Sequence, residues 1–354
     1  MERLTSIICK GSSNLIDLIE FDFIKQTFKK DRFSSIKEQE KDRWKSAIGT
    51  LFYIIFDDSA QTDEKCKQGF VNYLPFVYLP NHLFNSLLPS IVVLIREEQN
   101  YLSVHKGIRL GLLLTERIAL GSMSKDELQM QVHSDFLKNL IRIVTYSTCE
   151  EIRKLAYHLF EKYYGLFEAN TARHRLVNQL LDTVNQSGFL AQIIVKIKDT
   201  VLYQMNVRDN KDNEFLGHNL KIMIKRICVL KHGAETDILE VSDEVMASLN
   251  FLICVMMRDK SMKITGIWDL KDELISSYLK PLKTAIDISR GHYQLKQKES
   301  RPSKDSANEV TLMVGGQTVP QMSPGQMTDV INAALNTFDM MECVLSQLNG
   351  VLSA

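Results

Sequence analysis

The sequence predicts an all-α fold: a HEAT-like or armadillo-like helical solenoid with one small β-hairpin near the C-terminus. Gly and Pro number only 16 and 7 in 354 residues, and both are unfavourable in helix interiors. Apolar side chains recur at steps of three and four along most of the chain, which is the period of one helix face. About a dozen amphipathic helices with short polar joints are predicted, an arrangement that suits antiparallel neighbours.

The predicted helical array occupies residues 1–293. No strict repeat signature recurs in it, and successive helix pairs resemble one another only in their apolar faces. This looseness favours a degenerate HEAT-like or armadillo-like array over a strict repeat family. A compact irregular helical domain is the alternative.

Residues 69–95 carry no charged side chain, so they must be tested as a membrane span. A spanning helix needs about 20 predominantly apolar residues. Pro75, Pro80 and Pro89 divide this segment into short pieces, and a buried helix pair is predicted instead. Further on, Gly107 and Gly111 share one face of a predicted helix, where close helix packing is a better interpretation than a phosphate-binding loop.

Several helix starts are marked by capping patterns. Ser124 with Glu127, and Thr148 with Glu151, have capping-box spacing. A helix is also predicted from Gly188, because the following apolar residues form one stripe. The stripe consists of Leu190, Ile193, Ile194, Ile197, Val201 and Met205.

The C-terminal part departs from the repeat pattern. Residues 294–309 are polar and charged, which predicts a flexible loop. Residues 310–320 hold two β-prone runs around Gly-Gly, which predicts a hairpin packed on the helices, with Leu312 and Val314 on one face. Residues 323–354 begin Ser-Pro-Gly-Gln, and this pattern predicts a C-terminal helix that packs on the repeats.

No catalytic, cofactor or metal site is predicted, so we expect a protein that is not an enzyme. The eight His and six Cys form neither an HExxH pattern nor a zinc-finger spacing. No GxSxG elbow is present, and Cys149 is better explained as a first-turn cysteine than as a nucleophile. The unpaired cysteines and the absence of a signal peptide predict a reducing, cytoplasmic location.

Charge gives one local signal. Lys+Arg and Asp+Glu are both 43, so nucleic acid is not an expected partner. Residues 196–231, however, hold eight Lys/Arg against four Asp/Glu. This local excess could face an acidic partner patch, and an ordinary solvated helix face is the alternative.

The C-terminal third contains an ordered series of distinctive segments. They are GAETD (233–237), MASLN (246–250), TGIW (265–268), LKPL (279–282), SRGHY (289–293) and TFD (337–339). In this order and at these spacings, the series resembles the glomulin family. The resemblance extends backwards through Ile193-Ile194-Val195-Lys196-Ile197-Lys198 and covers most of the chain, which corresponds to the C-terminal HEAT-like half of longer members. The helical half that precedes it in those members is not in this sequence.

The resemblance implies a partner and a function. The glomulin family binds the small RING-finger subunit of cullin–RING ubiquitin ligases and masks the surface that receives the ubiquitin-conjugating enzyme. Immunophilins are implied as further partners by the resemblance alone. A non-catalytic helical-repeat scaffold or adaptor for a different protein is the alternative function. Neither function requires a cofactor or a membrane.

The resemblance also implies candidate partner-binding residues. The last lysine of the family's IIxxIK segment is implicated in RING binding, and it is Lys198 in this sequence. Lys196 departs from the pattern, because longer members carry an uncharged polar residue there. Trp268 is a weaker candidate, as an interface anchor or a core residue. Lys198 follows Ile197 by 100° around the helix, so we expect its side chain to be exposed and its amine free.

Overall fold

The computed structural model describes residues 38–56, 79–97, 100–207, 213–299, 313–314, 317–318 and 324–353. Within these ranges the predicted all-α class is confirmed, because helices form nearly all of the regular structure. The chain divides into two compact units, Met1–Leu176 and Val177–Ala354. Each unit is described by itself.

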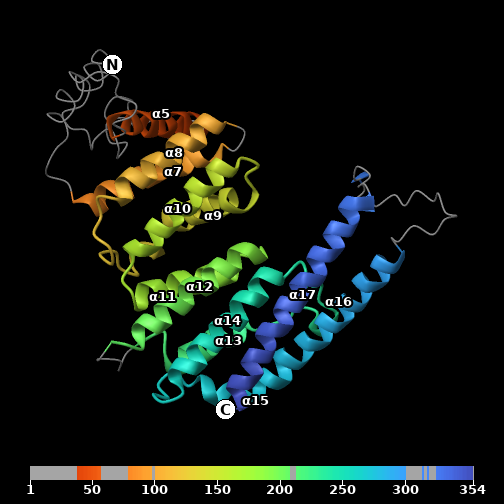
Figure 1. Cartoon of the computed structure of the whole chain (residues 1–354). Coiled ribbons are helices and arrows are strands. Elements are labelled where there is room, and N and C mark those ends of the chain that lie inside the picture. Colours follow the sequence, from red (N-terminus) through yellow and green to blue (C-terminus); the bar gives the residue numbers. More distant parts are fainter. Residues whose placement is uncertain are drawn as a thin grey trace, which may run out of the picture. The chain divides into compact units, whose positions relative to one another are not determined.

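The first unit is built from stacked pairs of helices. α7 and α8 form one pair, α9 and α10 form the next, and α7 packs on α9 while α8 packs on α10. α5 lies across both α7 and α8, as Figure 1 shows. Stacking of successive pairs is the packing mode of HEAT-like repeats. The helices are α5 (Glu38–Phe56), α7 (Pro80–Arg96), α8 (Tyr101–Thr115), α9 (Gln131–Tyr146), α10 (Glu150–Leu166) and α11 (Thr171–Thr183), which continues into the second unit.

The core of the first unit contains a buried polar group among aromatic rings. His133 on α9 is 1% exposed. Its Nδ1 lies 2.9 Å from the hydroxyl of Tyr163, and its Nε2 lies 3.0 Å from Oδ1 of Asn85. Because an amide oxygen only accepts, Nε2–H donates to Asn85 and the Tyr163 hydroxyl donates to Nδ1. Burial lowers the pKa of His133 to about 4, so the ring is neutral at pH 7.

Close helix packing at the two predicted glycines is confirmed. A Cβ on Gly107 would lie 2.7 Å from Cγ2 of Ile95, and one on Gly111 would lie 2.8 Å from Cδ2 of Leu159. Larger side chains at these positions would therefore push α8 away from α7 and α10.

Two local predictions in the first unit are wrong. Pro89 does not divide its segment, because α7 runs through it from Pro80 to Arg96; residues 69–78 lie outside the described ranges. Thr148 does not cap α10, because the N-cap is Cys149 and its side chain makes no capping bond. By contrast, the Ser124 N–H does donate to Oε2 of Glu127 at 2.5 Å, before the short 3₁₀ helix Glu127–Gln129.

The second unit is organised around two long neighbouring helices. α12 (Ser187–Gln204) packs along α14 (Ser242–Asp259), α17 (Pro324–Ser353) packs on α14, and α16 (Lys280–Glu299) packs on α17. The shorter elements are α13 (Gly217–Ile227), α15 (Lys271–Leu274) and the 3₁₀ helices η3 (Gly233–Glu235) and η4 (Ile267–Leu270). Figure 1 shows α16 and α17 side by side.

A π-helical turn, η5 (Ile275–Leu279), joins α15 to α16. Tyr278 in this turn is buried, and its hydroxyl lies 2.6 Å from Oγ of Ser248 on α14. The turn is therefore attached to the core of the second unit. Buried residues continue from it into α16 at Leu282 and Ile286.

The boundary of the predicted polar loop needs correction. α16 continues to Glu299, so the first part of the predicted loop 294–309 is helical. The helix continues because Gln, Lys and Glu favour helix even where no apolar face is buried. Residues 300–312 lie outside the described ranges. β1 (Met313–Val314) and β2 (Gln317–Thr318) pair antiparallel, with Met313 opposite Thr318. The packing of this hairpin on the helices stays a prediction, and Leu312 lies outside the described residues.

Candidate partner-binding surface

The sequence-predicted segment around Lys198 lies on α12, and α12 runs parallel to α14. Near their starts, the backbone N–H of Glu244 donates to Oγ of Ser187 at 3.1 Å. Near their ends, Nη2 of Arg258 donates to Oδ1 of Asn206 at 3.0 Å. Bonds between corresponding ends fix the two helices in parallel register. Between these bonds, the two helices bury apolar residues that include Ile193, Ile197, Val201, Leu252 and Val255.

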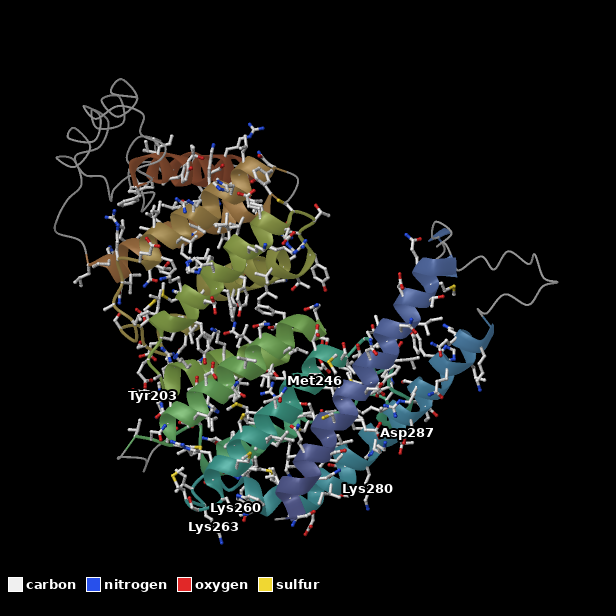
Figure 2. The ribbon with its side chains drawn as sticks, viewed as in Figure 1. Tyr203, Met246, Lys260, Lys263, Lys280 and Asp287 are labelled. Atoms are coloured by element: carbon white, nitrogen blue, oxygen red, sulfur yellow. The ribbon has the colours of Figure 1, made fainter. Side chains whose placement is uncertain are left out.

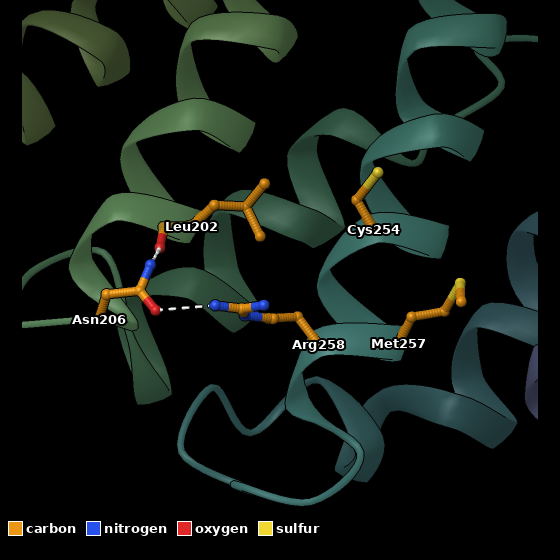
Figure 3. Close-up of a pocket in the computed structure, with 5 residues that line it drawn as sticks. All are labelled: Leu202, Asn206, Cys254, Met257 and Arg258. Carbon is orange, nitrogen blue, oxygen red and sulfur yellow. Dashed lines mark hydrogen bonds between the residues drawn. The ribbon is translucent and has the colours of Figure 1, made fainter.

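An open groove lies between the last turns of α12 and α14. Its volume is about 450 Å³. The Nδ2 group of Asn206 donates to the carbonyl oxygen of Leu202 at 2.8 Å, while Oδ1 accepts from Arg258, so the polar groups at this end are held by one another (Figure 3). The remaining lining is apolar or sulfur-containing. The groove is lined by Leu202, Asn206, Cys254, Met257 and Arg258.

Lys198 lies in line with this groove. Lys198 and Leu202 are four residues apart and share one face of α12, and Asn206 follows just beyond the end of the helix. The side chain of Lys198 is only 26% exposed, and its Nζ lies 3.6 Å from Oδ1 of Asp199. The expectation of an exposed side chain with a free amine is therefore wrong, because the neighbouring carboxylate holds the ammonium group and the helix surface covers the stem.

The predicted apolar stripe of α12 also needs one correction. Phe189 is buried, whereas Leu190 is only half-buried. Ile193, Ile194, Ile197 and Val201 are buried as predicted. The first turn is therefore rotated by one residue relative to the expected stripe, since the aromatic ring fills more of the core than leucine would.

On α13, the basic side chains of the stretch 196–231 are neutralised within the chain. Nζ of Lys221 lies 2.5 Å from Asp269, Nζ of Lys225 lies 2.7 Å from Glu273, and Nη2 of Arg226 lies 2.5 Å from Asp182. These carboxylates come from outside the stretch, so counting charges within it overestimated its excess. The expectation of a basic patch facing an acidic partner is not supported for α13.

The other two candidate residues differ in placement. Lys196 on α12 is half-buried, and its carbonyl oxygen accepts a bond from Oγ1 of Thr200 at 2.8 Å. Trp268 comes from η4, which packs against α13 and α14. Its ring is half-buried, and its Nε1 is buried without an acceptor among the described residues. The structure thus aligns Lys198 with the groove but places Trp268 on another element.

Sequence reasoning missed the residues that line the groove. The step of four from Lys198 could have indicated Leu202 and Asn206. Nothing comparable indicated Cys254, Met257 and Arg258, because these residues read simply as the end of an apolar helix. Their position follows from the parallel register of α14 with α12.

Among the described residues, no cluster of three or more His, Cys, Asp or Glu could hold a metal ion. No helix in the described ranges has both the length and the apolar character needed to cross a membrane. Burial raises the pKa of the Cys228 thiol, which disfavours the reactive thiolate.

The stacked helix pairs define this chain as an all-α helical protein. Residues 74–334 match the model of the family described as "Uncharacterised protein family, YAP/Alf4/glomulin", and the chain belongs to this family. Human glomulin is 28% identical over 323 residues, and mouse glomulin is 26% identical over 326 residues. Each alignment covers 90% of this chain and 52% of the relative, so the chain spans about half the length of these relatives.

Proposed function

We propose that this protein is a cytoplasmic, non-catalytic inhibitor of cullin–RING ubiquitin ligases. In this proposal it binds the RING-finger subunit and masks the surface that receives the ubiquitin-conjugating enzyme. Inhibition of this kind needs only a surface of sufficient area, because occlusion requires no bond to form or break. The observation that carries the proposal is membership of the glomulin family over most of the chain.

The α12–α14 groove supports a binding function at the proposed residue. Lys198 is aligned with Leu202 and Asn206 at the groove edge, and Asp199 holds its ammonium group in place. A charge that is already held loses less conformational freedom on binding than a mobile one. We therefore assign Lys198 the role of an oriented cation for an acidic or carbonyl-rich edge of the partner, with Lys196 and Trp268 as weaker candidates.

A direct binding experiment tests the proposal. The full chain is immobilised and incubated with a purified cullin-bound RING subunit at micromolar concentration, and ubiquitin transfer by the ligase is measured in parallel. We expect capture of the RING subunit and slower transfer. Absence of capture at this concentration would contradict the inhibitor function and favour the adaptor alternative.

Two substitutions in one ion pair sharpen the site assignment. Lys198→Met keeps the apolar stem and removes the charge. If the lysine is central to the interface, the free energy of binding to the RING subunit should weaken by about 2 kcal/mol or more. Asp199→Asn leaves Lys198 charged but no longer held by its neighbour, so affinity should fall by less than in the Lys198→Met protein. Lys280→Met on α16 is the matched control and should bind normally. Equal affinity of all three variants would remove Lys198 from the site.

A further inference from the structure

The segment 257–264, at the end of α14 and in the loop after it, has an unusual surface. All of its residues except Asp259 are exposed. Met257 is 62% exposed, Met262 38% and Ile264 37%. Between these apolar side chains lie Arg258, Lys260 and Lys263. Figure 2 shows Lys260 and Lys263 together at this end of the second unit.

The cations of this segment have no local counter-charge. Its one acidic residue, Asp259, is fully buried. Lys260 and Lys263 form no ion pair with any residue in the described ranges. Arg258 donates to the neutral amide of Asn206. The segment therefore presents three positive charges to solvent, in contrast to the neutralised lysines of α13.

Both carboxylate oxygens of Asp259 accept hydrogen bonds from the loop. Its Oδ1 accepts from the backbone N–H groups of Ile264 at 2.8 Å and Thr265 at 3.3 Å, and its Oδ2 accepts from Oγ1 of Thr265 at 2.7 Å. The N–H of Lys263 also donates to the Asp259 carbonyl at 2.9 Å. These bonds fix the backbone of the loop in the free protein, so little ordering is required on binding.

The segment is continuous with the α12–α14 groove, because Met257 and Arg258 belong to both. An apolar hollow of about 450 Å³ thus adjoins a row of unpaired cations. A ligand that matches both features carries an apolar side chain for the groove and carboxylates for the cations.

We propose that the groove and segment 257–264 form a docking surface for an acidic peptide segment with an apolar anchor residue. The apolar side chain enters the groove between Leu202, Cys254 and Met257, and the flanking carboxylates pair with Lys260 and Lys263. This surface goes beyond the RING-binding role assigned to Lys198, and it can be tested without a RING subunit. A peptide is favoured over an anionic membrane because the apolar part includes a hollow between two helices, which a single apolar side chain fills and a bilayer surface does not.

A peptide titration tests the surface. The probe is a fluorescein-labelled peptide of about eight residues, roughly 26 Å long when extended, in which Asp and Glu flank one Leu. Fluorescence anisotropy of the probe is followed as the full chain is added. We expect saturable binding by the natural sequence. The double variant Lys260→Glu, Lys263→Glu should bind at least about tenfold more weakly, because attraction becomes repulsion. The double variant Lys280→Glu, Lys298→Glu reverses as many exposed charges on α16 and should stay within about twofold of the natural protein.

Three outcomes would overturn the proposal. The first is no binding of the probe by the natural sequence. The second is an equal loss in both double variants, which would indicate an effect of net charge alone. The third is an unchanged affinity when Leu in the probe is replaced by Ser, which would exclude the groove. Vesicles of phosphatidylserine and phosphatidylcholine form the last arm, and Lys260/Lys263-dependent binding to vesicles without peptide binding would assign the surface to a membrane.

Discussion

Two buried polar side chains, His133 in the first unit and Asp259 in the second, have their hydrogen bonds satisfied in different ways. His133 is surrounded by aromatic rings and bonded to two neutral side chains. Asp259 accepts from the loop that it organises. The histidine therefore stabilises contacts between helices far apart in the sequence, whereas the aspartate stabilises only its local loop. A buried polar group can thus serve either packing or a surface, depending on where its partners come from.

Removing the Asp259 carboxylate should have the largest effect. Asp259→Ala leaves two backbone N–H groups and the Thr265 hydroxyl without their acceptor, and we expect the second unit to lose about 4 kcal/mol. Denaturant unfolding of a Trp44→Phe protein measures this loss, because Trp268 then reports on η4 beside the loop. The Trp268→Phe protein, with Trp44 in α5, should report an unchanged first unit. Equal losses at both probes would contradict the separation of the two roles.

Lowering the pH should destabilise the protein by protonating His133. The folded-state pKa of His133 is about 4, below the ordinary value near 6.5, so the unfolded chain binds more protons between these values. Stability is fully present above about pH 6.5 and falls by about 3 kcal/mol as the pH drops towards 4. Unfolding followed through Trp44 should show this loss. The step should be missing in a His133→Gln protein, whatever the stability of that variant; its persistence there would assign the loss to other groups.

A smaller test isolates one bond of the histidine. Tyr163→Phe keeps the ring in the core and removes only the hydroxyl that donates to Nδ1. We expect a loss of about 1–2 kcal/mol, because the ring nitrogen remains buried without a donor. The folded-state pKa of His133 should change in the same protein, which two-dimensional NMR of the imidazole can measure. An unchanged stability would mean that the bond contributes little.

The smallest expected effect concerns the loop backbone. Lys263 has φ of +50°, a conformation that glycine adopts without the steric cost of a Cβ. Lys263→Gly should therefore leave the second unit as stable as before or stabilise it by up to about 1 kcal/mol. A clear destabilisation in the Trp268 unfolding signal would indicate that the lysine side chain itself holds the loop.

The sequence was sufficient for the helical class and for packing contacts that depend on residue size. Gly107 and Gly111 indicated close packing because only a missing side chain permits it. The sequence was insufficient to predict local surface charge. Lys221 and Lys225 are neutralised by Asp269 and Glu273, about 48 positions away in each case. The groove was also missed, because it depends on the parallel register of α12 and α14. Lys198 was identified only through a family resemblance. Its contact with Asp199 shows that the position of a residue on a helix face did not by itself predict the exposure of its side chain.

The π-helical turn between α15 and α16 determines which side of the following helix is buried. Leu274, Tyr278, Leu282 and Ile286 are buried and follow at steps of four. In a straight α-helix, Ile286 would lie about 120° around the axis from Leu274. The wider turn absorbs part of that rotation and keeps the four side chains in phase. A deletion of Ser276 or Ser277, both exposed, would remove the extra residue and rotate every later position of α16 by about 100°. This turn is therefore a point where chain length, rather than side-chain identity, sets the fold.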